Sequence, residues 1–158
     1  MMKRFNAADT PLEGTNLIEA SAGTGKTFTI SMIYLRLLVE NKMRIDQILV
    51  VTFTVPATME LRLRIRSVIS DALRYCETGV VKEKIIAEIM DKHSDDPSVV
   101  QRLRGALKSF DEASVYTIHS FCQQVLADNA FESGSLFSSD ITSDDLIMAF
   151  FPCIYFES

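Results

Sequence analysis

The stretch that decides the fold is rich in glycine and reads Ala20-Ser21-Ala22-Gly23-Thr24-Gly25-Lys26-Thr27. The stretch 16–20 that leads into it is typical of a short buried strand, and apolar residues at helical spacing follow over 26–40, so the pattern predicts a strand, a tight loop and a helix. In such a loop, successive backbone N–H groups converge on phosphate oxygens, aided by the positive end of the helix dipole. The sequence therefore predicts a phosphate-binding loop.

Each polar residue of this loop has an expected role. Lys26 can reach the β and γ phosphates of a nucleotide, and the Thr27 hydroxyl can ligate Mg²⁺, so these two are the expected catalytic residues. The strict pattern begins with glycine, but many ATPases tolerate alanine there. The alternative is an incidental glycine turn between a strand and a helix. We expect the cofactors ATP and Mg²⁺, bound by Ala20, Ser21, Ala22, Gly23, Thr24, Gly25, Lys26, Thr27 and Phe28.

The rest of the chain alternates between strand and helix patterns. The stretch 47–52 carries the apolar run Ile48–Val51, which suits a central parallel strand covered on both faces, and 115–118 suits another buried strand. Thr54 can cap the helix that follows the first of these runs, and Pro56 fits its first turn. This order predicts an α/β fold, a parallel sheet flanked by helices. The remaining helices are expected at 54–76, 81–92, 99–110 and 119–129.

Composition bounds the class of protein. With 158 residues, 47% apolar and 23% charged, the chain suits one globular domain. It shows neither an apolar run long enough for a membrane helix nor an apolar secretory core, so we expect a cytoplasmic protein without a membrane partner. The three cysteines lie far apart, which gives no support to a disulfide framework.

Charge is unevenly distributed along the chain. Residues 1–108 hold 16 basic and 13 acidic side chains, a balance of +3, whereas 109–158 hold eight acidic and no basic ones, a balance of -8. Any contact with nucleic acid should therefore be local. The densest basic cluster is Arg62, Arg64 and Arg66, which a solvated helix face would also explain.

A second constellation lies where the strand at 47–52 ends and a helix begins. The hydroxyls of Thr52 and Thr54, the first amides of the helix and the side chain of Arg62 form a contact set suited to a phosphate backbone. Phe53 is either a core residue or a stacking surface for a base, and the residues alone favour the core.

A third constellation follows the strand at 115–118. Thr117 and Ser120 can bind phosphate oxygens, and His119 and Phe121 can stack on bases. The alternative is that His119 is a local hydrogen-bonding cap at the start of the helix.

Several blocks together resemble the RecB family, the β subunits of exodeoxyribonuclease V, within the UvrD-like superfamily 1 helicases. The resemblance covers about residues 10–137 and implies that the first block binds ATP. It also implies that the second and third blocks contact single-stranded DNA from the first RecA-like motor domain. The blocks are LIEASAGTGKTFTI at 17–30, VVTFT at 50–54, ELR at 60–62, RIR at 64–66, TIHSFC at 117–122 and NAFESG at 129–134.

The resemblance also implies a larger context. Residues 1–135 would form the N-terminal part of the first RecA-like motor domain, and 136–158 the start of an inserted domain or a divergent tail. The partners implied are single-stranded or duplex DNA ends, and RecC- and RecD-like subunits in the full-length protein, in double-strand break repair and recombination. The family usually has Glu and Ala where this chain has Val55 and Pro56. Superfamily 1 helicases commonly read adenine with an upstream Gln, for which Glu13 is the nearest polar substitute.

A motor ATPase also needs an acidic motif after a second apolar strand and an arginine finger from a second motor domain. Neither is evident, and Asp111 and Glu112 are assigned to a surface turn because a helix end precedes them. We therefore expect the chain alone to lack ATPase, unwinding and nuclease activity. Two other classes remain open, a small phosphate-loop enzyme such as a nucleotide kinase and a non-catalytic interaction module.

Overall fold

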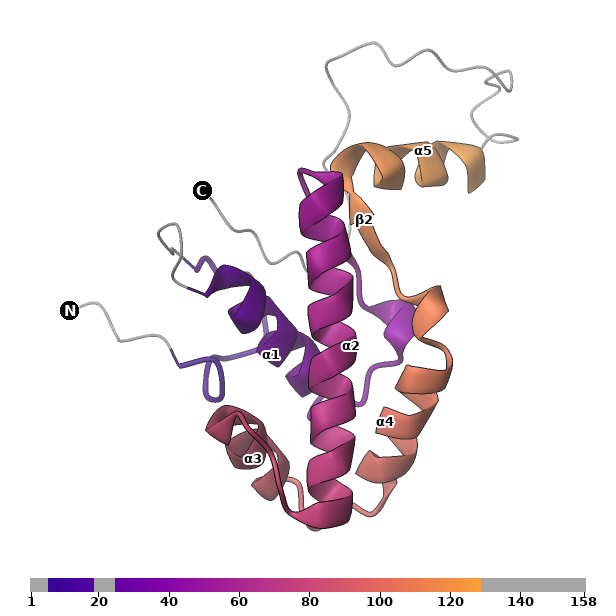
Figure 1. The fold of residues 1–158 in the computed structure, drawn as a ribbon. Coiled ribbons are helices and arrows are strands. Elements are labelled where there is room, and N and C mark those ends of the chain that lie inside the picture. Colours follow the sequence, from indigo (N-terminus) through magenta and orange to yellow (C-terminus); the bar gives the residue numbers. More distant parts are fainter. Residues whose placement is uncertain (1–5, 19–24, 129–158) are drawn as a thin grey trace, which may run out of the picture.

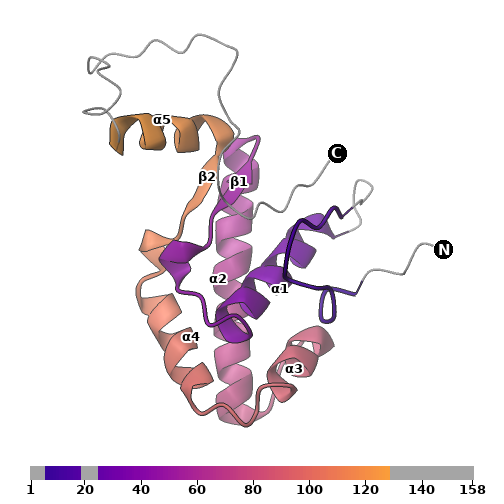
Figure 2. The same cartoon turned by 180° about the vertical axis from the view of Figure 1, so that it is seen from behind.

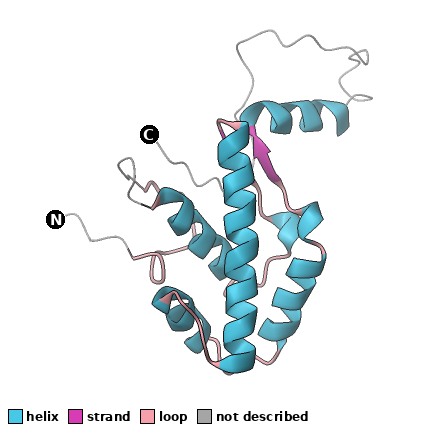
Figure 3. Ribbon diagram, viewed as in Figure 1, coloured by secondary structure: helices cyan, strands magenta, loops and turns pink. Residues whose placement is uncertain are grey.

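The computed structural model of the chain describes residues 6–18 and 25–128. Helices dominate this part, with one small sheet among them (Figure 1, Figure 3). The helices begin and end within three residues of the bounds predicted from the sequence. The elements in chain order are α1 (Lys26–Val39), the 3₁₀ helix η1 (Ile45–Gln47), β1 (Val50–Thr52), α2 (Val55–Thr78), α3 (Lys84–Asp91), α4 (Ser98–Lys108), the 3₁₀ helix η2 (Phe110–Glu112), β2 (Val115–Thr117) and α5 (Ile118–Asp128).

Helix α2 is the spine of the described part, and α1, α3 and α4 pack around it (Figure 1, Figure 2). It begins as predicted, because the Thr54 hydroxyl accepts a hydrogen bond from the backbone N–H of Ala57 at 3.3 Å and Pro56 lies in the first turn. It ends at Gly79, whose φ of 70° lies in the left-handed region that glycine adopts without strain. Its buried residues recur at helical spacing and are Leu61, Ile65, Val68, Ile69 and Ala72.

Helix α1 is more deeply buried than its sequence predicted. The apolar spacing predicts one buried face, but the turn from Ser31 to Arg36 is buried on all sides. The reason is that α2, α3 and α4 all contact this helix. Tyr34 lies at its centre and donates a hydrogen bond from its hydroxyl to the carbonyl oxygen of Ile45 at 3.4 Å. Burial raises the pKa of the Tyr34 hydroxyl above its ordinary value.

The strands β1 and β2 pair in parallel, as predicted, with Val50 opposite Val115. Strand β2 is buried, but β1 is not covered on both faces, because Val51 is 38% exposed and its two neighbours are half-buried. The prediction of a central strand covered on both faces is wrong for the described residues, because β1 is an edge strand of their two-stranded sheet and the face that carries Val51 stays partly exposed. The strand predicted at 16–20 lies partly outside the described residues.

A buried arginine fastens the amino-terminal turn to α1. The guanidinium of Arg36 donates hydrogen bonds to the carbonyl oxygens of Ala7 at 3.0 Å and Thr10 at 2.7 Å. It also pairs with both carboxylate oxygens of Glu40, at 2.6 and 2.8 Å. Because Arg36 is only 5% exposed, losing it would leave these acceptors without their partner.

The substitution Arg36→Met tests this fastening. We expect it to lower the free energy of unfolding by about 3 kcal/mol, since it leaves the Glu40 carboxylate and two backbone carbonyls without their hydrogen-bond donor. The measurement is urea denaturation followed by circular dichroism. The control is Arg44→Met, which removes an exposed ion pair with Asp46 and should change stability little. Equal effects of the two substitutions would contradict the account.

Candidate nucleotide and nucleic-acid site

The ends of the two strands bring the second and third constellations together. Thr52 and Thr117 are the last residues of β1 and β2 and lie directly opposite each other in the parallel register. Helix α5 begins immediately after β2, and α2 begins at Val55, after the two-residue turn Phe53–Thr54 that follows β1. Both helix N-termini therefore lie at one edge of the sheet (Figure 2). We call Thr52–Thr54 together with Thr117–Phe121 the strand-end edge.

The threonine hydroxyls on the β1 side of this edge order the start of α2. The Thr52 hydroxyl oxygen lies 2.6 Å from that of Thr58, and the Thr54 hydroxyl caps the helix. The carbonyl oxygen of Thr54 also accepts a hydrogen bond from the hydroxyl of Thr58 at 3.1 Å. The first N–H groups of a helix have no partner within the helix, so this start presents donors to an anion.

The β2 side is built in the same way. The Thr117 hydroxyl accepts a hydrogen bond from the backbone N–H of Ser120 at 3.1 Å and lies 2.8 Å from the Ser120 hydroxyl. Thr117 therefore caps α5, and the alternative assignment of His119 as the cap is wrong. His119 is exposed and Phe121 is half-buried. An imidazole and an aromatic ring thus lie beside the helix start.

Phe53 lies on the surface and not in the core. The residues alone favoured a core position, but its side chain is 84% exposed. The reason is that β1 ends at Thr52, so Phe53 lies in the turn before α2, where no described element covers it. The ring is therefore presented to solvent at the strand-end edge.

Arg62 lies in α2 but turns toward the entry to β2. Its guanidinium donates hydrogen bonds to the carbonyl oxygens of Ala113 at 3.1 Å and Asp111 at 3.4 Å, and its Cζ lies 5.8 Å from the centre of the Phe110 ring. Asp111 and Glu112 lie in the exposed η2 turn, which confirms their assignment to a surface turn. Sequence reasoning missed this anchor, because no local pattern joins Arg62 to Phe110.

Only the end of the predicted phosphate loop lies within the described residues. Ala20, Ser21, Ala22, Gly23 and Thr24 fall outside them. Gly25 has a φ of 84°, a left-handed conformation, and α1 begins at the next residue, Lys26. The first turn of α1 carries no acidic side chain, so nothing within it offsets the positive end of the helix dipole.

A cation–π contact joins this first turn to α2. The guanidinium carbon of Arg64 lies 5.3 Å from the centre of the Phe28 ring, which places the end of the phosphate loop beside the middle of α2. Glu13 lies elsewhere, in a hollow of about 320 Å³ lined also by Arg36 and Asn41 near the other end of α1. A helix of this length spans about 21 Å, so Glu13 lies far from Lys26 along the axis.

Comparison with known proteins identifies the class first. The sequence matches the family described as UvrD/REP helicase N-terminal domain over residues 1–151, so the chain belongs to this family. No helix within 6–18 and 25–128 is long and apolar enough to cross a membrane.

The individual proteins that the sequence resembles are RecB subunits. The RecBCD enzyme subunit RecB of Escherichia coli is 42% identical over an alignment of 154 positions, and the match covers 92% of this chain and 13% of that protein. RecB of Haemophilus influenzae is 39% identical over an alignment of 162 positions, and the match again covers 92% of this chain and 13% of the relative. The resemblance to RecB is confirmed. This chain spans 13% of the length of these two relatives.

The substitution Thr117→Val tests the cap on α5. It keeps the shape of the side chain but removes the acceptor for the Ser120 N–H, so we expect the free energy of unfolding to fall by about 1 kcal/mol. Urea denaturation provides the measurement, and Thr78→Val, at the exposed far end of α2, is the matched control. A stability equal to that of the unaltered chain would show that Thr117 is not the cap.

Proposed function

We propose that this chain is the ATP-binding N-terminal part of an ATP-dependent DNA helicase and exonuclease subunit, the β subunit of exodeoxyribonuclease V. Residues 1–135 would belong to the first RecA-like motor domain and 136–158 to an inserted domain or a divergent tail. The family match and the likeness to RecB support this proposal. In the full-length protein, the partners would be DNA ends and RecC- and RecD-like subunits, in double-strand break repair and recombination.

The observation that carries the proposal is the strand-end edge. Thr52 and Thr117 lie opposite each other, and each strand leads into the N-terminus of a helix. In open parallel sheets, ligands bind outside the carboxyl ends of the strands. Helix starts offer N–H donors to phosphate oxygens, and the exposed Phe53 and His119 offer rings to unpaired bases. This set suits a single strand of DNA.

The residues at the start of α1 suit Mg-ATP. Gly25 allows the left-handed turn that brings the backbone close to a phosphate, and Lys26 and Thr27 follow it in the first turn. Lys26 would neutralise the β and γ phosphates, and the Thr27 hydroxyl would ligate Mg²⁺. Bound Mg-ATP would supply the γ-phosphoryl group, and its transfer to water would drive movement along DNA.

Hydrolysis needs more than these residues provide. Within the described part of the chain, β1 leads into Phe53 and Thr54, and β2 leads into Ile118 and His119, so neither strand is followed by an acidic side chain. A carboxylate after a strand is what a motor ATPase uses to hold Mg²⁺. We therefore propose that this chain alone binds without catalysing ATP hydrolysis, unwinding or DNA cleavage.

The nucleotide assignment is tested with Lys26→Ala. We expect weak binding of Mg-ATP to the unaltered chain and at least a tenfold loss of affinity in the variant, because one close charge on the phosphates disappears. Isothermal titration calorimetry measures both, with and without EDTA. The matched control is Lys108→Ala, an exposed lysine at the end of α4. Identical heats for Lys26→Ala and the control would contradict the assignment of Lys26 to nucleotide binding.

The DNA assignment is tested at its exposed rings. We expect weak, salt-sensitive binding to single strands, less to duplex, and a loss of about fivefold or more in Phe53→Ala and His119→Ala, because stacking contributes about 1 to 3 kcal/mol per base. Fluorescence anisotropy with an oligothymidylate gives the affinities. The control is Val80→Ala, an exposed apolar residue beyond the opposite end of α2. Arg62→Ala is a poor probe, because it also removes an anchor of the fold. Superimposable curves for all variants would refute the assignment.

A further inference from the structure

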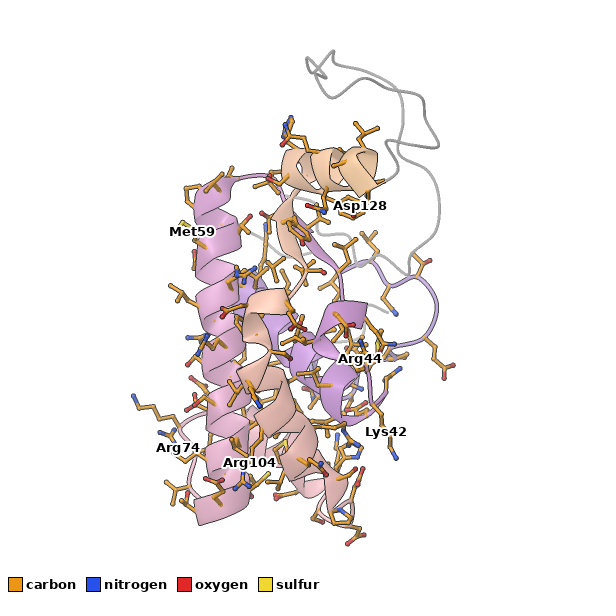
Figure 4. The ribbon with its side chains drawn as sticks, turned by 90° about the vertical axis from the view of Figure 1, so that its right-hand side faces the viewer. Lys42, Arg44, Met59, Arg74, Arg104 and Asp128 are labelled. Atoms are coloured by element: carbon orange, nitrogen blue, oxygen red, sulfur yellow. The ribbon has the colours of Figure 1, made fainter. Side chains whose placement is uncertain are left out.

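The outward side of α2 carries a row of uncovered apolar side chains. Val55, Met59 and Leu63 are 61%, 61% and 70% exposed, and their spacing of four residues places them on one side of the helix. Phe53, which is 84% exposed, lies two residues before Val55 in the turn that leads into the helix. We call these four residues the α2 strip. Figure 4 shows Met59 on the upper half of α2.

The α2 strip differs from the rest of the same helix side. Further along this side the residues are Ser70, Arg74 and Glu77, which are polar and suit contact with water. Single exposed apolar residues are ordinary on protein surfaces, but a contiguous row of four marks a surface that another segment covers. The strip therefore indicates a docking surface confined to the first half of α2.

Positive charge lies along one flank of the α2 strip. Arg62 and Arg66 lie along one flank, where their guanidinium carbons are 5.8 and 5.5 Å from the centre of the Phe110 ring. Arg64 points to a different side of α2, over Phe28. Residues 53–66 contain these three arginines and a single acidic residue, Glu60. The complementary surface is therefore both apolar and acidic.

A second copy of this chain fits the strip poorly. In a two-fold dimer the same patch meets itself, so the arginines at positions 62 and 66 of one copy would approach those of the other. Like charges brought together across an interface oppose association. The occupant should instead carry the opposite charge.

The carboxyl-terminal part of the chain has this chemistry. Leu146–Phe156 is apolar throughout, Asp144 and Asp145 precede it, Glu157 follows it, and no Lys or Arg occurs after Lys108. These residues lie outside the described part of the structure. The segment matches the α2 strip in both respects, apolar against apolar and acidic against basic.

The connection is long enough to allow this contact. The 17 residues 129–145 separate the end of α5 from Leu146, and an extended chain of this length reaches about 56 Å. Helix α2, with 24 residues, is about 36 Å long. The segment can therefore reach any point on the strip.

We propose that Leu146–Phe156 packs on the α2 strip of its own chain, with its flanking carboxylates toward Arg62 and Arg66. The segment covers Phe53, Val55, Met59 and Leu63. The inference rests on the exposed strip and the charge pattern, and it does not depend on nucleotide or DNA binding.

Disulfide trapping in the full chain tests this contact, because Cys153 lies within the segment. Cys76 and Cys122 are replaced by serine, and Met59→Cys introduces one thiol on the strip. With oxidised glutathione as the oxidant, we expect an intramolecular disulfide to Cys153 to form at least tenfold faster than in a control with Lys84→Cys at the start of α3. Non-reducing electrophoresis and mass spectrometry measure the rates. Met59, Lys84 and Cys76 are exposed and Cys122 is half-buried, so the fold should tolerate these changes.

A further variant checks that packing, and not a long flexible connection, causes the fast reaction. Adding Phe150→Asp to the Met59→Cys chain should slow the reaction to the control rate, because a carboxylate then enters the apolar contact. Equal rates for Met59→Cys and Lys84→Cys, or a fast rate that Phe150→Asp leaves unchanged, would overturn the proposal. A disulfide that forms only between chains would also overturn it and would indicate a second copy as the occupant.

Discussion

The packing of the buried side of α2 is the interaction on which the rest of the structure depends. Leu61, Ile65 and Ile69 are almost inaccessible to solvent, and α2 contacts α1, α3, α4 and both strands. Burying such side chains stabilises the fold by about 1.5 to 3 kcal/mol each. Because β1 leads into α2 through a two-residue turn, the position of α2 also sets the position of Thr52–Thr54.

Two arginines of α2 contact the elements next to both candidate sites. Arg62 reaches from α2 to the turn before β2, and Arg64 reaches to Phe28 in the first turn of α1. One helix thus contacts the element that follows the phosphate loop and the element that precedes the third constellation. In the proposed motor, such a helix would connect the nucleotide site with the DNA-contacting edge, and α1 lies on one side of it while β2 and α5 lie on the other (Figure 1).

The sequence predicts the parts of this fold that depend on local chemistry. Thr54 with Pro56 marks the start of α2, Gly79 marks its end, and apolar spacing identifies its buried side. It does not predict what depends on distant neighbours. Phe53 looked like a core residue because nothing local shows that the sheet leaves it uncovered, and the role of Arg62 depends on Phe110, far along the chain. The phosphate-loop assignments at 20–24 and the ligand contacts remain predictions.

The central claim is that α2 holds the ends of β1 and β2 together as one binding edge for single-stranded DNA. Amide chemical-shift mapping by NMR, with a short oligothymidylate added to the full chain, tests it most directly. The account predicts that the largest shifts fall together at Thr52–Thr58 and Thr117–Phe121, with little change at Val80–Lys84 beyond the far end of α2. Shifts that cluster around 80–84, or that affect one strand end without the other, would contradict it.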